Sequence, residues 1–249
     1  MSELVIEVSG VSKSYGGVIA NNKVSMTVPA GKITGLIGPN GSGKTTMFNS
    51  IVGYHPIDEG SIKFKGKEIS DLRVPQIARL GLLRTFQQTR IYGAMNCIDN
   101  MLISIPHRTH GFKDMFGARH DKATMEDVDR LLDFVGLYEK RRLKSGDLSF
   151  GQQKLLEFAM ALMNKPEVLL LDEPTAGINP TLINGLIDRL RRANEEFGIT
   201  LFVIEHNMRV IMNMAESIYC LAHGELLAHG SPDDIQNDQR VIDAYLGAH

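Results

Sequence analysis

The stretch GLIGPNGSGKTTMFNSIVGY, residues 35–54, sets four glycines of a short loop between an apolar run and an amphipathic run. Each glycine costs backbone entropy on folding, so their density indicates that the backbone itself comes close to something. The pattern GxxxxGK(S/T) is matched by Gly38, Gly43, Lys44 and Thr45. In this pattern, with a strand before it and a helix after it, successive backbone N–H groups cradle a triphosphate. The sequence therefore predicts a phosphate-binding loop (P-loop).

Each part of the P-loop has an expected role. We expect Lys44 to reach the β- and γ-phosphates and the Thr45 hydroxyl to ligate Mg²⁺. Glycines are expected wherever a Cβ would obstruct the phosphates or the turn. The alternative, a merely flexible turn, is disfavoured by the apolar strand before the loop and the helix after it. The predicted nucleotide-binding residues of the loop are Gly38, Pro39, Asn40, Gly41, Ser42, Gly43, Lys44, Thr45 and Thr46.

A second motif, VLLLDEP at residues 168–174, supplies what a phosphate cradle lacks for hydrolysis. Its apolar residues predict a short strand of the kind that is buried in a parallel sheet. Asp172 ends this strand and can hold the metal ion, while Glu173 can polarise the attacking water. Alone, such an acidic pair is as often a strand end with solvated charges. Together with the P-loop it predicts a hydrolytic site.

Composition favours a globular chain and narrows its partners. The 249 residues are 43% hydrophobic, which is enough to fill a core. A net charge of −2 gives no basic excess for binding nucleic acid. Cys97 and Cys220 lie in unrelated contexts and support neither a disulfide framework nor a zinc site. No leader pattern and no run of eighteen apolar residues is found, so we expect a cytoplasmic chain that does not cross a membrane by itself.

Strand and helix patterns alternate along the chain. Short β-type pieces at residues 4–8, 24–28 and 33–37 predict a strand-rich lobe that leads into the P-loop. Residues 90–144 are rich in methionine and poor in β-branched runs, which predicts an inserted and mostly helical segment. Strands and helices alternate again from residue 151 onward, which indicates βαβ units around a parallel sheet.

The segment LSFGQQK at residues 148–154, hereafter the signature segment, carries a family resemblance. It is similar to the LSGGQ signature of the ATP-binding subunits of ABC transporters, and the chain resembles that family from near Glu3 to its end. In the family this segment of one subunit covers the γ-phosphate of ATP held by the other. The resemblance implies that Ser149, Gly151 and Gln152 contact nucleotide, with a hydroxyl and backbone donors at a helix start. The alternative for Ser149 is an ordinary helix N-cap.

The resemblance implies one fold and one division of the chain. The expected class is α/β, a P-loop NTPase core whose mostly parallel sheet is flanked by helices, with an N-terminal antiparallel β-lobe and an inserted α-helical subdomain. Residues 1–249 would form one ABC ATPase domain. Within it, residues 1–89 and 165–249 would make the RecA-like core with its β-lobe, and residues 90–164 the helical signature subdomain.

Three further positions gain roles from the resemblance. Tyr15 resembles the aromatic residue that stacks on adenine, although a tyrosine in a turn is usually only partly buried packing. Gln87 resembles the glutamine that senses Mg²⁺ and water, with Gln88 adjacent to it. His206 resembles the histidine that contacts the γ-phosphate and holds the catalytic geometry. The implied catalytic residues are Glu173, His206 and Gln87, and the implied metal ligands are Thr45, Gln87 and Asp172.

Two departures from the family pattern stand out. Phe150 occupies a signature position where the consensus has glycine, and Asn179 replaces the aspartate that many relatives carry in a loop crossing the dimer interface. An aromatic residue in the signature, AGINP after the DEPT segment, VIEHNM and VIDAYLG all resemble the branch that takes up branched-chain and other hydrophobic amino acids. The resemblance therefore implies an importer.

The implied mechanism needs other chains. Two such ATPase subunits, identical or merely related, would close on two ATP molecules and drive separate permease subunits docked near residues 87–101. An extracytoplasmic solute-binding protein would take part indirectly, and the chain would sit on the cytoplasmic face of the membrane. A soluble ABC ATPase acting on nucleic acid or ribosomes is the alternative, but no long coiled coil, second cassette or basic charge supports it. A P-loop small-molecule kinase leaves the signature segment and His206 unexplained.

Overall fold

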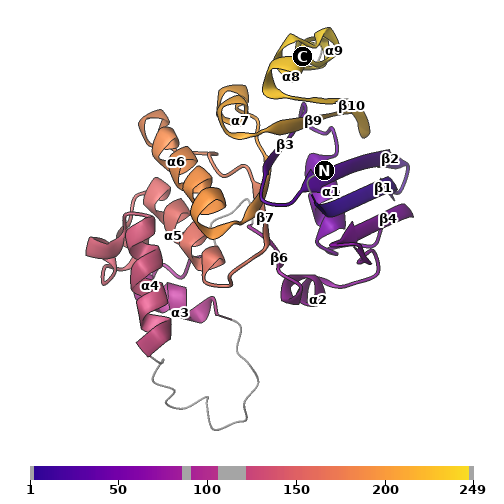
Figure 1. The fold of residues 1–249 in the computed structure, drawn as a ribbon. Coiled ribbons are helices and arrows are strands. Elements are labelled where there is room, and N and C mark those ends of the chain that lie inside the picture. Colours follow the sequence, from indigo (N-terminus) through magenta and orange to yellow (C-terminus); the bar gives the residue numbers. More distant parts are fainter. Residues whose placement is uncertain (1–2, 86–90, 106–121, 247–249) are drawn as a thin grey trace. The chain divides into compact units, whose positions relative to one another are not determined.

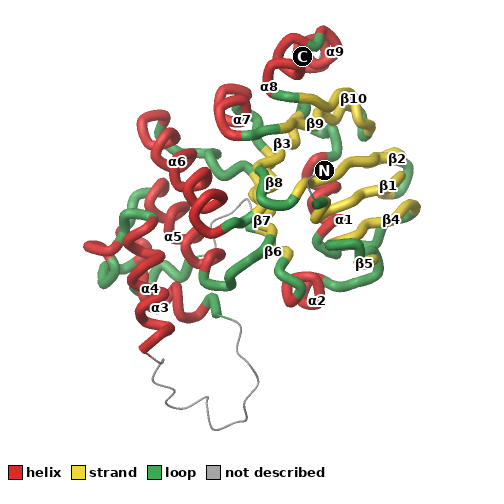
Figure 2. The backbone as a smooth tube through the Cα atoms, viewed as in Figure 1, coloured by secondary structure: helices red, strands yellow, loops and turns green. Residues whose placement is uncertain are grey.

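The computed structural model describes residues 3–85, 91–105 and 122–246, and its elements are drawn in Figures 1 and 2. The chain divides into two compact units, which are described separately below. Unit 1 comprises Met1–Gln87, Glu167–Ala176 and Leu190–His249, and unit 2 comprises Gln88–Pro166 and Gly177–Arg189. Among the described helices, none is both long and apolar enough to cross a membrane.

A six-stranded mixed sheet organises unit 1 (Figure 1). Three central strands, β3, β8 and β7, are buried along their whole length, as expected for strands covered on both faces. All neighbouring strands pair in parallel except β10, which pairs antiparallel with β9 at the edge. In order across the sheet the strands are β10 (Glu225–Gly230), β9 (Ser217–Ala222), β3 (Ile33–Ile37), β8 (Thr200–Ile204), β7 (Val168–Asp172) and β6 (Leu82–Arg84).

An antiparallel sheet of four strands forms the predicted β-lobe. The hairpin formed by its strands β1 (Leu4–Tyr15) and β2 (Val18–Pro29) is much longer than the two five-residue strands predicted at residues 4–8 and 24–28. Shifts of register interrupt the regular pairing of these two strands, but the pairing continues beyond each shift. The order is β2 (Val18–Pro29), β1 (Leu4–Tyr15), β4 (Glu59–Phe64) and β5 (Lys67–Glu68). The α/β fold class with a β-lobe is confirmed.

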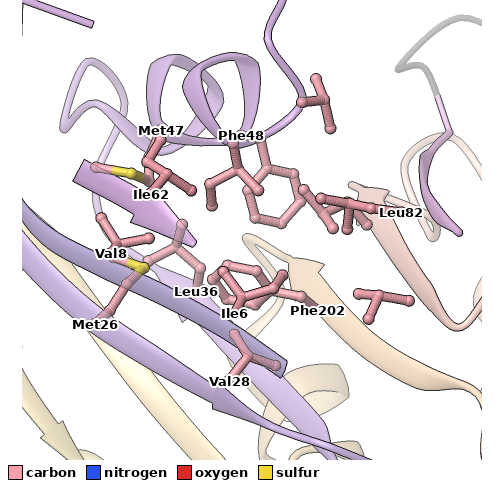
Figure 3. Packing of buried hydrophobic residues seen from close by; sticks show 14 of the residues in the cluster. Ile6, Val8, Met26, Val28, Leu36, Met47, Phe48, Ile62, Leu82 and Phe202 are labelled. Atoms are coloured by element: carbon pink, nitrogen blue, oxygen red, sulfur yellow. The ribbon is translucent and has the colours of Figure 1, made fainter. Parts of the chain in front are cut away.

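Helix α1 (Lys44–Ile51) packs its apolar side chains into the core of unit 1 (Figure 3). Phe48 of α1 is fully buried and its ring lies 4.8 Å from that of Phe202 in β8. The same cluster contains Ile6 of β1 and Leu36 of β3, so both sheets bury residues in it. The other helices of this unit are α2 (Val74–Arg79), α7 (Met208–Met214), α8 (Pro232–Asn237) and α9 (Gln239–Leu246).

Unit 2 is helical in its described part, as the sequence predicted. It holds α3 (Cys97–Ile103), α4 (Lys122–Phe134), short 3₁₀ turns at Tyr138–Lys140 and Ser145–Asp147, and α5 (Phe150–Leu162). Helix α6 (Pro180–Phe197) starts in unit 2 and ends in unit 1. The buried amide of Asn100 binds the hydroxyl of Ser145 at 2.8 Å, and this tethers α3 to the turn that leads into the signature segment.

Residues 177–189 group with unit 2, whereas the division that the family resemblance implies places them with the core. The contacts explain the difference. The ring of Phe150 lies so close to Gly177 that a Cβ there would be 2.9 Å from it. Leu182 likewise packs on Gly151. These are contacts between segments far apart in the chain, which local patterns do not reveal.

Candidate functional site

The P-loop joins β3 to α1, and backbone carbonyl oxygens of two neighbouring strands approach it closely. A Cβ on Gly38, which has a φ of +147°, would lie 2.1 Å from the carbonyl oxygen of Leu221 in β9. A Cβ on Gly43, with a φ of +97°, would lie 2.2 Å from the carbonyl oxygen of Ala20 in β2. Both positions therefore require glycine for the approach of other strands as well as for their backbone conformation.

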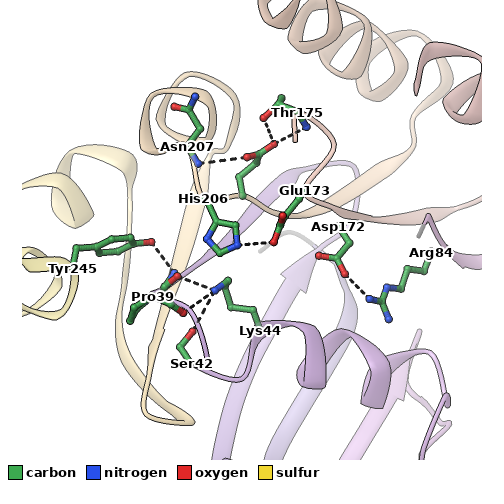
Figure 4. A network of polar contacts seen from close by, with 12 residues as sticks. Pro39, Ser42, Lys44, Arg84, Asp172, Glu173, Thr175, His206, Asn207 and Tyr245 are labelled. Atoms are coloured by element: carbon green, nitrogen blue, oxygen red, sulfur yellow. Dashed lines mark hydrogen bonds and ion pairs between the residues drawn. The ribbon is translucent and has the colours of Figure 1, made fainter. Parts of the chain in front are cut away.

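Lys44 lies inside the loop with its ammonium group turned back on the backbone (Figure 4). Its Nζ donates to the carbonyl oxygens of Gly38 at 2.8 Å and Pro39 at 3.0 Å. Burial lowers the pKa of Lys44, and the carboxylates of Glu173 and Asp172 oppose that shift. A buried cation facing two neutral acceptors is suited to an incoming anion, because a phosphate oxygen makes a stronger charge-assisted bond than a carbonyl does.

Asp172 ends β7 with its carboxylate buried, at 1% exposure. One oxygen is paired with the guanidinium of Arg84 in β6, which also contacts the side-chain oxygen of Asn49. The other oxygen, Oδ1, has no hydrogen-bond partner among the described residues. Burial raises the pKa of Asp172, and Arg84 opposes the rise. An oxygen left without a donor in a buried carboxylate is available to a hard cation.

Glu173 and His206 come together across the ends of two adjacent strands. The register pairs Asp172 of β7 with Ile204 of β8, so the residues that follow each strand meet at one edge of the sheet. His206 Nε2 lies 2.5 Å from Glu173 Oε1. Glu173 has a φ of +50°, an uncommon conformation for a non-glycine residue that its N–H bond to the Ile204 carbonyl at 2.9 Å supports. The sequence-predicted acid and histidine therefore form one pair.

Glu205 is a residue of this site that the sequence analysis missed. Its side chain is 2% exposed, and Oε1 accepts from the Thr175 backbone N–H at 3.0 Å and from the Thr175 hydroxyl at 2.6 Å. Oε2 faces the N–H of Asn207 at 3.5 Å. Glu205 thus ties the loop after Glu173 to the loop that carries His206 (Figure 4). The signal was present as an acid directly after the apolar run of β8.

Other predicted residues lie apart from this pair or outside the described residues. Tyr15, at the end of β1, is 49% exposed and meets His55 edge to face at 5.6 Å, so a large part of the ring is accessible. Gln87 belongs to residues 86–90, which lie outside the described residues. The nucleotide roles of Tyr15 and Gln87 stay predictions.

The signature segment starts α5 in unit 2. Ser149 is the N-cap, since its hydroxyl accepts from the N–H of Gln152 while the Gln152 side chain accepts from the Ser149 N–H. The structural role considered for Ser149 is therefore present. Ser149 and Phe150 are nevertheless exposed, and Gly151 and Gln152 are half-buried. Contact of this segment with nucleotide stays a prediction.

Replacing Glu205 by glutamine should destabilise the fold by roughly 2–4 kcal/mol, because the buried donors of Thr175 would lose a charged acceptor. Urea unfolding of the whole chain measures this. Glu216→Gln is the matched control, since Glu216 pairs with Lys32 at 2.6 Å but is half exposed, and a surface pair of this kind is worth at most about 1 kcal/mol. Equal unfolding midpoints for the two variants would show that Glu205 does not hold the loops.

Known proteins are similar to this chain over nearly all of its length. A family model described as ABC transporter matches residues 21–176, more than half of the chain. A second, described as branched-chain amino acid ATP-binding cassette transporter, matches residues 225–249. The high-affinity branched-chain amino acid transport ATP-binding protein BraF of Pseudomonas aeruginosa is 37% identical, and the alignment covers 99% of each chain.

Solved structures show the same fold. A crystal structure described as the ADP conformation of an ATP-binding cassette of an ABC transporter aligns with a TM-score of 0.88 and 29% identity, covering 98% of this chain and 99% of the other. A dimeric cassette described as a post-hydrolysis state bound to ADP and phosphate aligns with a TM-score of 0.76 and 24% identity, covering 91% and 98%. With its P-loop, its acidic strand end and its full-length relative, the chain belongs to the ABC transporter family as one of its ATP-binding subunits.

Proposed function

We propose that this chain binds ATP with Mg²⁺ and hydrolyses it to power an importer for branched-chain or other hydrophobic amino acids. The observation that carries the hydrolytic part is the contact of His206 with Glu173 at 2.5 Å, at the sheet edge where Asp172 ends the neighbouring strand. A carboxylate held by an imidazole beside a buried aspartate is suited to orient water and accept its proton.

The residues fit a magnesium nucleotide. The free Oδ1 of Asp172 and the hydroxyl of Thr45, in the first turn of α1, are oxygen ligands of the type that Mg²⁺ takes. No group of three His, Cys, Asp or Glu side chains that could hold a metal forms within the described part of the chain. A site with few protein ligands is typical of Mg²⁺, which keeps waters and shares phosphate oxygens. When bound, the ion neutralises charge on the phosphates.

Different residues of the chain bind the phosphates, orient the attacking water and hold the catalytic carboxylate in place. The P-loop amides and Lys44 bind phosphate oxygens, with the Lys44 ammonium moving from the Gly38 and Pro39 carbonyls to the stronger acceptor. Glu173 orients the attacking water and accepts its proton. His206 holds the Glu173 carboxylate in place, and Glu205 keeps the two loops together by its bonds to Thr175.

The proposal extends to a pair of ATPase subunits. Ser149 and Phe150 are exposed at the start of α5, so this helix terminus is accessible to a second subunit. The dimeric cassette described above, which has the same fold, is the precedent for such a pair. We propose that Ser149, Gly151 and Gln152 of one subunit contact ATP held by the P-loop of the other, in a dimer of identical or related subunits.

The transport assignment draws on the relatives. BraF is described as a branched-chain amino acid transport protein, and residues 225–249 match a model for that branch. We propose that the chain works with separate permease subunits at the cytoplasmic face of the membrane, and indirectly with a solute-binding protein on the other side.

Glu173→Gln should keep ATP binding but lower phosphate release by about 10²- to 10⁴-fold, since it removes the proton acceptor and leaves the P-loop intact. Fluorescent ATP binding and phosphate release measure the two effects separately. Glu167→Gln is the matched control, because Glu167 pairs with Lys65 at 2.6 Å on the surface of the same unit. Phosphate release at the wild-type rate in Glu173→Gln would show that Glu173 is not the group that accepts the proton of the attacking water.

A test of the transport role is to tag the chain in its host, solubilise membranes in mild detergent with ATP and identify what co-purifies. We expect two polytopic membrane proteins, with or without a second ATPase. A solute-binding protein in the same complex would then allow its amino-acid preference to be measured. Recovery with ribosomes or DNA-bound proteins and no membrane protein would contradict the transporter assignment while leaving the ATP chemistry intact.

A further inference from the structure

The C-terminal helix α9 is hydrogen-bonded to the P-loop. The backbone N–H of Gly38 donates to the hydroxyl of Tyr245 at 2.8 Å (Figure 4). On its other side the carbonyl of Gly38 accepts from Lys44 Nζ, also at 2.8 Å. The backbone of Gly38 is therefore held on both sides, by Tyr245 at the N–H of one peptide group and, at the carbonyl of the next, by the lysine that would meet the phosphates.

The helix that carries Tyr245 is anchored at its start. Val241, one turn earlier in α9, is 2% exposed, and its N–H bonds to the Asp238 carbonyl at 3.0 Å at the start of the helix. The ring of Tyr245 lines a cavity of about 600 Å³ together with Met208 and Met212 of α7. Burial raises the pKa of Tyr245 to about 12, so the hydroxyl stays neutral and keeps its proton near pH 7.

A cavity lies beside the part of the P-loop that follows the hydrogen bond between Gly38 and Tyr245. A cavity of about 280 Å³ lies next to residues 39–42 and is also lined by His223, Asp243 and Ala244. The loop is thus free of close packing on that side while Gly38 is bonded. The Leu221 and Ala20 carbonyls restrict the loop at Gly38 and Gly43, and the Tyr245 hydroxyl adds a hydrogen bond at Gly38, whereas residues 39–42 border the cavity.

Taking the proposed ATP site as given, we propose that Tyr245 is a positioning residue through which the C-terminal helix α9 sets the affinity of the P-loop for nucleotide. Fixing the Gly38 N–H limits backbone rotation at Gly38, and this keeps the carbonyl of the next peptide group in reach of Lys44 before nucleotide arrives. A preorganised loop loses less conformational entropy on binding than a mobile one. Movement of α9 away from Gly38 would weaken binding without touching Glu173 or His206.

Tyr245→Phe removes only the hydroxyl and tests this. We expect the Kd for ADP and for ATP to rise about three- to tenfold, the factor that one hydrogen bond of ordinary strength is worth. The KM for ATP should rise with it, while kcat at saturating ATP stays within about twofold because the catalytic pair is unchanged. Fluorescent nucleotide titration, steady-state phosphate release and thermal melting of the full chain give these values.

Two controls separate positioning from general destabilisation. Tyr54→Phe changes a tyrosine that is 67% exposed in the same unit and should leave the Kd unchanged. Val128→Ala removes a fully buried side chain in α4 of unit 2, so it lowers the melting temperature without altering the P-loop. The inference is overturned if Tyr245→Phe keeps the wild-type Kd, or if Val128→Ala loses as much affinity. Absence of ATP binding by the wild-type chain would instead contradict the proposed function.

Discussion

Two carbonyl oxygens fix the shape of the P-loop, and the rest of the site depends on that shape. The Leu221 carbonyl leaves no room for a Cβ on Gly38, and the Ala20 carbonyl leaves none on Gly43. Leu221 belongs to the mixed sheet and Ala20 to the antiparallel one, so both sheets of unit 1 meet the loop. Neighbouring strands therefore restrict the loop at both glycines. Lys44 lies inside this loop, where burial lowers its pKa and the carboxylates of Glu173 and Asp172 oppose that shift.

The catalytic residues depend on a second constraint, the parallel pairing of β7 with β8. Because Asp172 lies opposite Ile204, the chain leaves both strands at the same edge, and Glu173 comes within reach of His206. Glu205 holds the loops that carry Glu173 and His206 together, because it accepts two hydrogen bonds from Thr175. A buried carboxylate that accepts several hydrogen bonds holds loops firmly, but substituting the carboxylate or one of its donors leaves buried polar groups unpaired. The site thus consists of strand ends joined by a buried hydrogen-bond network.

Local motifs predicted much of this architecture, and contacts between distant segments account for what they missed. The P-loop and the strand ending in Asp172 are readable from the sequence because each joins a short apolar run to a clear local motif. The β-lobe strands were predicted too short, since bulges interrupt the alternation without ending the strands. Arg84 and Tyr245 were missed because their partners, Asp172 and Gly38, are far away in the chain. Glycines are expected where a Cβ would obstruct the phosphates or the turn, and at Gly38 and Gly43 the structure shows in addition that a Cβ would meet carbonyl oxygens of neighbouring strands.

A crystal structure of the full chain with Mg²⁺ and a non-hydrolysable ATP analogue would test these interactions. We expect phosphates against the P-loop amides, Lys44 Nζ moved from the Gly38 and Pro39 carbonyls onto phosphate oxygens, and the metal ion near Thr45 and Asp172 Oδ1. The backbone at Gly38 and Gly43 should stay where the Leu221 and Ala20 carbonyls hold it. Phosphates bound elsewhere, or a Lys44 still bonded to the two carbonyls beside a bound nucleotide, would contradict the central claim.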